Sequence, residues 1–330
     1  MTDARQFSIK FDEWDLPAEA PKDGRPDTPA NTDTRSMAMR AKIAEDEKKR
    51  QEPVCYISFG SGSSGNSCYI GTRRAGVIVD CGVNPDIIER TLEANGVGMT
   101  AVVGVCLTHD HSDHVRFVYK LLRTHRHLRV YCTNRVLNAM LRHHGISKRI
   151  KDYHKPVFKE FPFTLGDFEI TAFDVPHDAA DNSGYCFQTG QLRFVIATDL
   201  GAVSERAEYY MKDADYLVIE ANYDRDMLRH GPYPEYLKAR IATDHGHLDN
   251  ADTAAFLSRI APGSKLKHIF LCHLSNDNNT PEKALATVRT ALEAAGLTVG
   301  DGNDTLADRA ADLQLQALPR LQPTRWYVLR

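Results

Sequence analysis

Short apolar runs separated by glycine-rich or polar turns dominate the chain from about residue 54 onward. Runs of this length, rich in β-branched and aromatic residues, are typical of buried strands. They predict strands at 54–59, 67–72, 75–80, 101–107, 128–132, 168–176, 184–190, 192–199, 215–221, 267–273 and 324–329. Apolar residues at helical spacing predict helices at 85–97, 115–124, 134–145, 233–242, 250–260 and 281–295. Runs of strands followed by helices predict an α/β fold, with two sheets enclosed between helices.

The first 52 residues have a different composition. They are rich in Asp, Lys, Arg, Pro and Ala and lack a sustained apolar period. We expect a charged, disordered tail over 1–52, with a short helix at 37–52 where charges of both signs recur, and a hydrolase domain over 53–330. The first 15 residues lack the apolar stretch of a signal peptide, and no run of 18 apolar residues predicts a membrane span.

The seven cysteines are scattered, and no two of them form a CxxC pair. Most stand inside apolar, strand-like runs such as VVGVCL and KHIFLCHL. This pattern favours buried thiols in a reducing compartment over a disulfide framework or a thiolate zinc site. We therefore expect a cytoplasmic protein.

Charge is unevenly distributed, although the net charge is only −3. Residues 116–151 contain ten Lys or Arg residues and no Asp or Glu. A block of one sign can form an electropositive wall for a polyanion such as nucleic acid. The alternative is a helix face that is solvated or paired with acidic residues elsewhere in the fold.

The segment 108–114, THDHSDH, concentrates metal-ligand side chains at the end of a predicted strand. His109 and His111 are two positions apart, so they can project to the same side. Asp113 and His114 follow in the turn into the next helix and can reach a second position nearby. Imidazole and carboxylate are ligands for Zn²⁺ and for harder divalent ions. The segment therefore predicts two neighbouring metals, each with an incomplete ligand shell.

The missing ligands are expected at other strand ends. His177 follows a predicted strand, and Asp199, His273 and Asp80 each stand at the last position of one. One histidine in such a place is usually structural, but the recurrence of this setting alongside an intact HxHxDH favours a metal site over a histidine-rich loop.

The chain resembles the metallo-β-lactamase fold superfamily over roughly residues 54–329. The shared features are HxHxDH after a strand, followed by a His, an Asp and a His at later strand ends. Finer motifs are similar to those of the YycJ/WalJ group of bacterial nucleases, namely SGSSGNSCYIG, VPHDAADNSGYCF, IATDLG, GHLDN and LCHLSNDNNTPE. The resemblance implies a four-layer αββα sandwich.

The resemblance also implies a ligand set. His109, His111 and His177 would hold one metal, Asp113, His114 and His273 the second, and Asp199 would bridge the two. Asp80 would orient the HxHxDH loop without binding metal.

Two metals close together suit hydrolysis of a phosphodiester, with a metal-bridging hydroxide as the nucleophile. The resemblance to transfer-RNA-processing nucleases implies that His247 donates the proton to the leaving group and that Glu220 orients it, so that His247, Glu220 and the ligand Asp113 are the expected catalytic residues. The alternative for His247 is a histidine at a helix N-terminus, beside a cap at Asp249 or Asn250.

Two asparagines are weaker candidates. Asn66 lies in GSGSSGN, whose backbone N–H groups can form an anion nest close to the metals. The same string resembles a serine-hydrolase elbow, but a strand follows it where that motif needs a helix, so Ser63 and Ser64 are rejected as nucleophiles. Asn278 is a candidate contact for a phosphate.

We expect a metal-dependent phosphodiesterase acting on nucleic acid, and specifically a DNA exonuclease whose 5′ to 3′ polarity follows only from the resemblance. The alternatives are an RNA-processing nuclease, a hydrolase of a thioester, lactone or β-lactam, and a binding protein with a degenerate site. The two divalent ions are Zn²⁺ or Mn²⁺, and the sequence leaves this choice open. Protein partners and oligomeric state cannot be read from the sequence, and no membrane association is expected.

Overall fold

The computed structural model describes residues 52–329. The predicted tail and its short helix lie outside the described residues apart from Glu52, so the predicted domain boundaries stay a prediction. Within the described part of the chain, no helix is both long enough and apolar enough to span a bilayer.

Seven strands form the first sheet, in the order β15-β1-β2-β3-β4-β5-β6. The strands from β3 to β6 are parallel, whereas β1 pairs antiparallel with β2 and β15, and β2 pairs antiparallel with β3. The strand bounds are β1 (Cys55–Gly60), β2 (Ser67–Gly71), β3 (Gly76–Val79), β4 (Val102–Cys106), β5 (Val130–Cys132), β6 (His154–Pro156) and β15 (Tyr327–Val328).

Eight strands form the second sheet, in the order β13-β14-β12-β11-β10-β9-β8-β7. The five strands from β10 to β13 in this order are parallel, and β7, β8, β9 and β10 form an antiparallel series. The strand bounds are β7 (Phe163–Leu165), β8 (Phe168–Asp174), β9 (Ser183–Thr189), β10 (Leu192–Ala197), β11 (Tyr216–Glu220), β12 (His268–Cys272), β13 (Val299–Gly300) and β14 (Leu313–Ala317).

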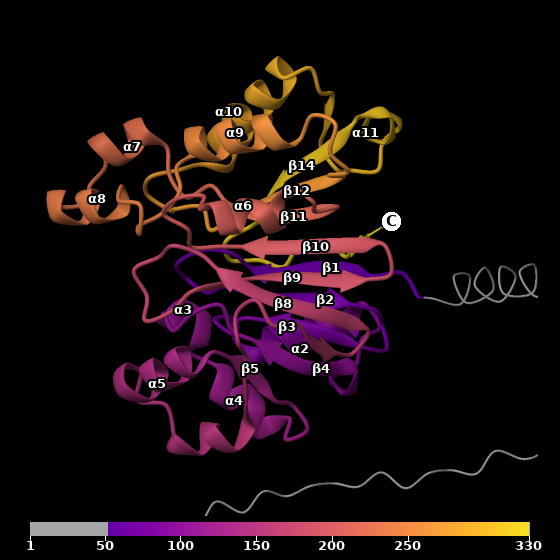
Figure 1. Cartoon of the computed structure of the whole chain (residues 1–330), viewed down its shortest axis with the longest axis vertical. Coiled ribbons are helices and arrows are strands. Elements are labelled where there is room, and N and C mark those ends of the chain that lie inside the picture. The colour runs from indigo at the N-terminus through magenta and orange to yellow at the C-terminus, as the bar shows by residue number, and fades with distance from the viewer. Residues whose placement is uncertain (1–51, 330) are drawn as a thin grey trace, which may run out of the picture. The chain divides into compact units, whose positions relative to one another are not determined.

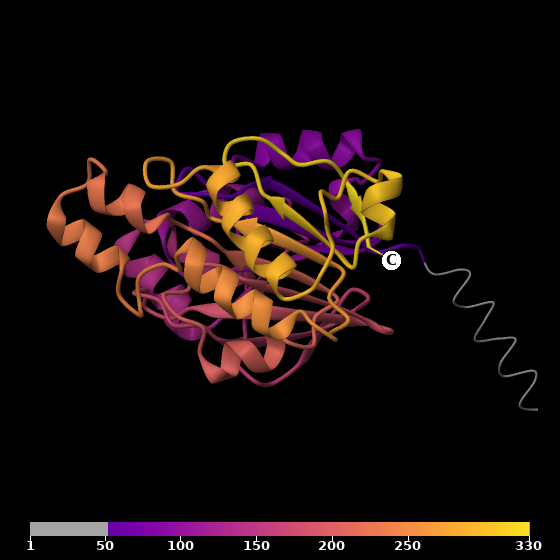
Figure 2. The ribbon, with the colours of Figure 1, turned by 90° about the horizontal axis from the view of Figure 1, so that it is seen from above.

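Helices cover the outer faces of both sheets. The first sheet is accompanied by α2 (Pro85–Ala94), α3 (Ser112–Val115), α4 (Val118–Thr124) and α5 (Asn134–His143), with 3₁₀ turns η1 (Met99–Ala101) and η2 (Lys148–Tyr153). The second is accompanied by α6 (Glu205–Met211), α7 (Arg225–His230), α8 (Glu235–Ile241), α9 (Asn250–Ile260), α10 (Pro281–Ala294) and α11 (Leu306–Ala310). The strands lie between α9 and α10 at the top and α4 and α5 at the bottom (Figure 1), and α2 is seen from above in Figure 2.

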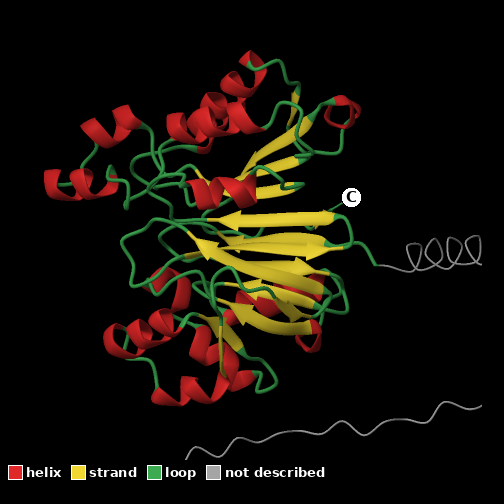
Figure 3. Cartoon of the chain, viewed as in Figure 1, coloured by secondary structure: helices red, strands yellow, loops and turns green. Residues whose placement is uncertain are grey.

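Successive side chains along each buried strand point to opposite faces of its sheet, and this alternation produces the layers of the fold. Tyr56 belongs to the apolar cluster between the two sheets, and its neighbour Ile57 belongs to the cluster beneath α2, α4 and α5. In the second sheet Val218 faces the first sheet, whereas Leu217 and Ile219 pack under the helices. Because successive side chains of a strand point to opposite faces, each sheet is apolar on both faces and needs a layer on each side. The fold is therefore the expected αββα sandwich, with helices outside and strands inside (Figure 3).

The helix predicted at 115–124 is present as α4, but it begins at Val118 instead of Val115. The chain forms α3, breaks at Phe117, and resumes as α4. The Phe117 N–H donates to the Cys81 carbonyl at 3.0 Å, and the carbonyl of Asp113, its partner in an unbroken helix, accepts from the Asn66 N–H at 2.8 Å. Both backbone groups are thus used to attach the histidine-rich loop to the first sheet. A Cβ on Gly82 would lie 1.5 Å from the Asp113 carbonyl oxygen, so this close approach requires glycine.

Several short elements were not predicted, among them α6, α7 and the strands β6, β7, β13 and β14. The other predicted strands and helices are present, with ends shifted by a few residues. All seven cysteines are buried and free, as expected.

Candidate metal centre

The candidate ligands all stand at one edge of the paired sheets. His109 and His111 follow β4, His177 follows β8, Asp199 follows β10, and His273 follows β12. The strands β10, β11 and β12 are parallel, and β8 runs in the same direction because it is separated from β10 by one antiparallel strand. Their carboxyl ends therefore meet, although the residues are far apart in sequence.

Three of the strand-end residues have left-handed backbone conformations. The φ angles are +59° at Asp80, +54° at Asp199 and +54° at His273. Non-glycine residues adopt this conformation rarely, and strained backbone of this kind is concentrated at functional sites. Here it turns the chain sharply after β3, β10 and β12, which leaves each side chain at the edge of its sheet.

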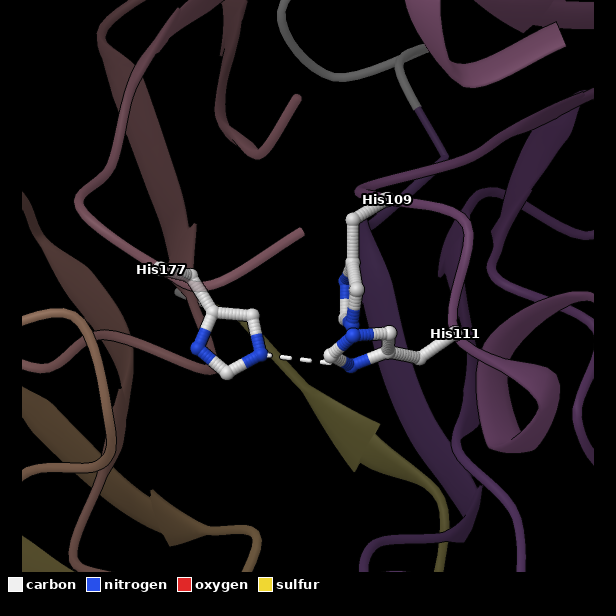
Figure 4. A group of neighbouring side chains, drawn as sticks. All are labelled: His109, His111 and His177. Atoms are coloured by element: carbon white, nitrogen blue, oxygen red, sulfur yellow. Dashed lines mark hydrogen bonds between the residues drawn. The ribbon is translucent and has the colours of Figure 1, made fainter. Parts of the chain in front are cut away.

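Three imidazoles form the first group of potential ligands. Ligand nitrogens of His109, His111 and His177 lie within 4.8 Å of one another. The His177 Nε2 atom is 3.3 Å from His111 Nδ1, the contact drawn as a dashed line in Figure 4. The buried His109 Nε2 has no hydrogen-bond partner. Three nitrogens converge here, and one of them is buried without a hydrogen-bond partner. This arrangement suits binding of a shared cation better than hydrogen bonding among the three imidazoles.

A second group lies beside the first. Ligand atoms of Asp113, His114 and His273 are within 4.8 Å of one another, and the buried His273 Nε2 has no hydrogen-bond partner. Asp199 stands between the groups. One of its carboxylate oxygens is 3.3 Å from His114 Nε2, and the other is 3.9 Å from His177 Nε2. This arrangement of nitrogen and oxygen donors fits divalent metal binding.

Hydrogen bonds to the opposite ring nitrogens orient two of these imidazoles. His114 Nδ1 lies 2.8 Å from an Asp80 carboxylate oxygen, and the same carboxylate accepts from the backbone N–H and hydroxyl of Thr108 at 2.8 and 2.9 Å. His177 Nδ1 lies 2.9 Å from the Gly246 carbonyl oxygen. Such contacts fix the ring and leave Nε2 available for a metal.

Electrostatics divides the histidines into two kinds. Burial lowers the pKa of His109, His111 and His177, which favours the neutral imidazole that binds a cation. Burial also opposes charge on His114 and His273, but neighbouring carboxylates, above all Asp199, raise the pKa of both above the usual value. The site therefore attracts positive charge, which a metal ion would supply.

Glu220 and His247 are brought together beside this cluster. Glu220 Oε1 lies 2.8 Å from both His247 Nδ1 and His273 Nδ1. Its other oxygen accepts from the backbone N–H groups of Leu200 and Leu248 at 2.8 and 3.3 Å. The carboxylate is fully buried, whereas the His247 side chain is one-fifth exposed. Glu220 thus links a candidate ligand to a histidine that reaches solvent.

The two asparagines have different positions. Asn66 Nδ2 lies 2.9 Å from His114 Nε2 and 3.1 Å from an Asp113 carboxylate oxygen, so Asn66 reaches the cluster. Asn278 is fully buried, and its side-chain carbonyl packs beneath Gly231. Its backbone N–H donates to the Ser275 hydroxyl at 3.2 Å, so Asn278 helps to hold the loop after β12. Its contact with a phosphate stays a prediction.

Other supporting residues were missed by sequence reasoning. The Thr198 hydroxyl donates to an Asp199 carboxylate oxygen at 2.7 Å, and Asn182 donates to the Asp199 carbonyl at 2.8 Å. Asn222 donates to the His273 carbonyl at 2.7 Å. In the sequence, all three stand within the conspicuous motifs or at strand ends. Neighbouring polar residues share these positions, so position alone does not identify the three as supporting residues.

The geometry agrees with comparisons to known proteins. Residues 76–269 match the beta-lactamase superfamily domain. The chain belongs to this superfamily. It is 36% identical over 249 residues to "Exodeoxyribonuclease YycJ" of Bacillus anthracis, covering 74% of this chain and 90% of the relative. "Exodeoxyribonuclease WalJ" of Streptococcus pneumoniae serotype 2 (strain D39 / NCTC 7466) is 36% identical over 246 residues, with the same coverage.

Solved structures support the fold. The metallo-beta-lactamase fold protein YhfI from Bacillus subtilis superposes with a TM-score of 0.57 at 14% identity, covering 83% of this chain and 99% of that chain. Superfamily membership, together with the clustered His and Asp ligands, identifies this protein as a metal-dependent hydrolase.

Proposed function

We propose that the enzyme hydrolyses phosphodiester bonds of nucleic acid as a DNA exonuclease that acts in the 5′ to 3′ direction. The observation that carries the proposal is a basic groove next to the candidate metal centre. Relatives named exodeoxyribonucleases match three quarters of the chain at 36% identity, which supports DNA as the substrate.

The groove has a volume of about 750 Å³ and is flanked by α5, η2 and the loop after β8. Its cationic residues are exposed, and none has an ion-pair partner within residues 52–329; they are Arg135, Arg142, Lys148 and Lys151. Ala180 also lines the groove, and its N–H donates to the carboxylate of Asp110, between the two metal-ligand candidates His109 and His111, at 3.1 Å. Unpaired cations beside a hydrolytic site suit a phosphate backbone, and hydrolysis of a small neutral ester has no need of them.

The two groups of donor atoms support the ligand assignment of this proposal. His109, His111 and His177 would hold one divalent ion, and Asp113, His114 and His273 a second, with Asp199 shared between them. When bound, such ions supply Lewis acidity and lower the pKa of water. Zn²⁺ and Mn²⁺ both suit this mixture of imidazole and carboxylate.

His247 supplies the proton for the leaving group in this proposal. Burial by itself lowers the pKa of His247, but the Glu220 carboxylate at 2.8 Å raises it above the usual value. During hydrolysis the bond between phosphorus and the leaving oxygen breaks, and that oxygen takes the proton of His247 Nε2. Water supplies the oxygen that joins phosphorus, and the proton that this water releases returns through solvent to His247. Glu220 orients the ring by holding Nδ1.

The test is cleavage of linear DNA labelled at either end, alongside matched RNA and closed circular single-stranded DNA, in Mn²⁺ and in Zn²⁺. Wild type should shorten linear DNA from its 5′ end and leave circles intact, and Asp199→Ala and His247→Ala should both be inactive. His245→Ala is the matched control, because His245 is exposed two residues from His247. Hydrolysis of a thioester without cleavage of any nucleic acid would refute the proposed substrate.

A further inference from the structure

A second cavity lies beside His247, on the side of the candidate metal centre occupied by α7 and α8. Its volume is about 180 Å³. One wall of the cavity is apolar and is formed by Tyr233, Leu237 and Ile241. The rest of the lining includes an ion pair between Arg240 of α8 and Asp178. It also includes residues of the loops around the candidate metal centre, namely Ser63, Asn222, Gly246, His247 and Ser275.

The apolar wall is held in place by its own contacts. Tyr233, Leu237 and Ile241 pack with Tyr223 and Leu228 in a small cluster that joins α8 to the body of the domain. The Tyr233 hydroxyl donates to a carboxylate oxygen of Asp277 at 3.0 Å. Figure 1 shows α7 and α8 projecting beyond the strand ends, with α5 on the same side of the molecule below them. The aromatic ring is therefore a fixed surface near the reacting groups.

We infer that this cavity binds the terminal nucleoside of a single-stranded end, with the base against Tyr233 and Leu237; this inference rests on the proposed function. The direction of proton transfer supports it. His247 protonates the leaving oxygen, so the leaving nucleoside must lie on the side of His247, and this cavity shares His247 with the metal centre. For an enzyme acting in the 5′ to 3′ direction, the leaving oxygen is the 3′ oxygen of the terminal nucleotide, and the shortened strand keeps a 5′ phosphate.

The volume and the apolar wall of the cavity favour a single nucleobase as the ligand. A volume of about 180 Å³ is below the range usual for drug-sized ligands, so it suits one base with part of its sugar. A base inserted here cannot remain paired or stacked in a duplex. The DNA strand would then extend across the metal centre toward the basic groove at α5. The groove contacts the phosphate backbone and does not distinguish one base from another. The enzyme thus removes one unpaired nucleotide at a time, with little dependence on sequence.

The experiment compares release of a normal terminal nucleotide with release of a terminal nucleotide that lacks its base, from otherwise identical single-stranded oligonucleotides. Base stacking on an aromatic side chain is worth about tenfold in binding. Tyr233→Ala should therefore lower the ratio of the two kcat/KM values, normal over abasic, by about tenfold relative to wild type, and Tyr233→Phe should preserve it. Tyr236→Ala is the control, because Tyr236 is on α8 but 77% exposed.

Leu237→Trp tests the same inference if Tyr233→Ala does not fold. The larger ring fills the cavity, so this variant should also lower the ratio of the two kcat/KM values. An unchanged ratio in a folded Tyr233→Ala or Leu237→Trp enzyme that still releases nucleotides would overturn the nucleoside pocket and leave the proposed nuclease function intact. A wild-type enzyme that releases no nucleotide from any end would overturn the proposed function, and this inference with it.

Discussion

The basic groove should account for a measurable part of the salt dependence of DNA binding. The perturbation is the quadruple substitution of Arg135, Arg142, Lys148 and Lys151 by Gln, which removes the four cations that line the groove. All four side chains are exposed, and they make no ion pair within the described residues, so their loss should leave the fold intact.

The magnitude follows from counterion release. For single-stranded DNA the slope of log affinity against log salt is about −0.7 for each phosphate contact. Four contacts contribute a slope of about −2.8, which corresponds to a loss of about 50-fold in affinity between about 50 mM and about 200 mM salt. The quadruple variant should lose this contribution, so its affinity should be weaker at low salt and less sensitive to added salt.

The assay is fluorescence anisotropy of a labelled single-stranded oligonucleotide across a salt series, with Asp199→Ala present in every protein to prevent cleavage. The control replaces four exposed cations on other elements by Gln, which changes the net charge equally; these are Arg90, Lys212, Lys283 and Arg309. An unchanged slope in the groove variant, or an equal change in the control, would refute the argument that the groove forms a specific path for the backbone.

Three further outcomes are expected at the metal centre. Asp80→Asn should lower bound metal, measured by elemental analysis, and activity by about 10- to 100-fold, because the amide holds His114 Nδ1 less well than the carboxylate at 2.8 Å does. Glu220→Gln should move the alkaline limb of the pH–rate profile to lower pH. The sign follows because a general acid acts only while protonated, and Glu220 raises the pKa of His247; a limb that stays in place would exclude His247 as that acid. Chelation with EDTA should lower the melting temperature by about 5 °C, because the buried Asp199 loses its counterion. An equal shift in Asp199→Ala would contradict this reason.

Local spacing made much of the candidate metal centre predictable. His109 and His111 alternate after a strand, and Asp113 and His114 follow within one turn, so their proximity depends on only a few backbone angles. The pairing of Glu220 with His247 was expected from resemblance to related nucleases, and the structure brings the two side chains to 2.8 Å. Their roles stay predictions, because proximity does not establish proton transfer.

Other features were beyond local reasoning. The burial of Asn278 depends on how the loop after β12 packs beneath Gly231, and the break at Phe117 depends on hydrogen bonds to Cys81 and Asn66. These partners lie far along the chain from the segments that they affect, so no local pattern of residues indicates them. The same limitation applies to Thr108, whose backbone and hydroxyl bind the carboxylate of Asp80.

By itself, the sequence determined the class of fold and supplied the candidate ligands, because strand periodicity and the HxHxDH spacing act over a few residues. Only the tertiary structure decided which atoms meet. Parallel pairing of β10, β11 and β12 brings Asp199, Glu220 and His273 to one edge, and the left-handed turns at Asp199 and His273 present their side chains there. The basic groove and the cavity beneath α8 likewise exist only when distant elements pack, since long-range contacts set the position of one element relative to another.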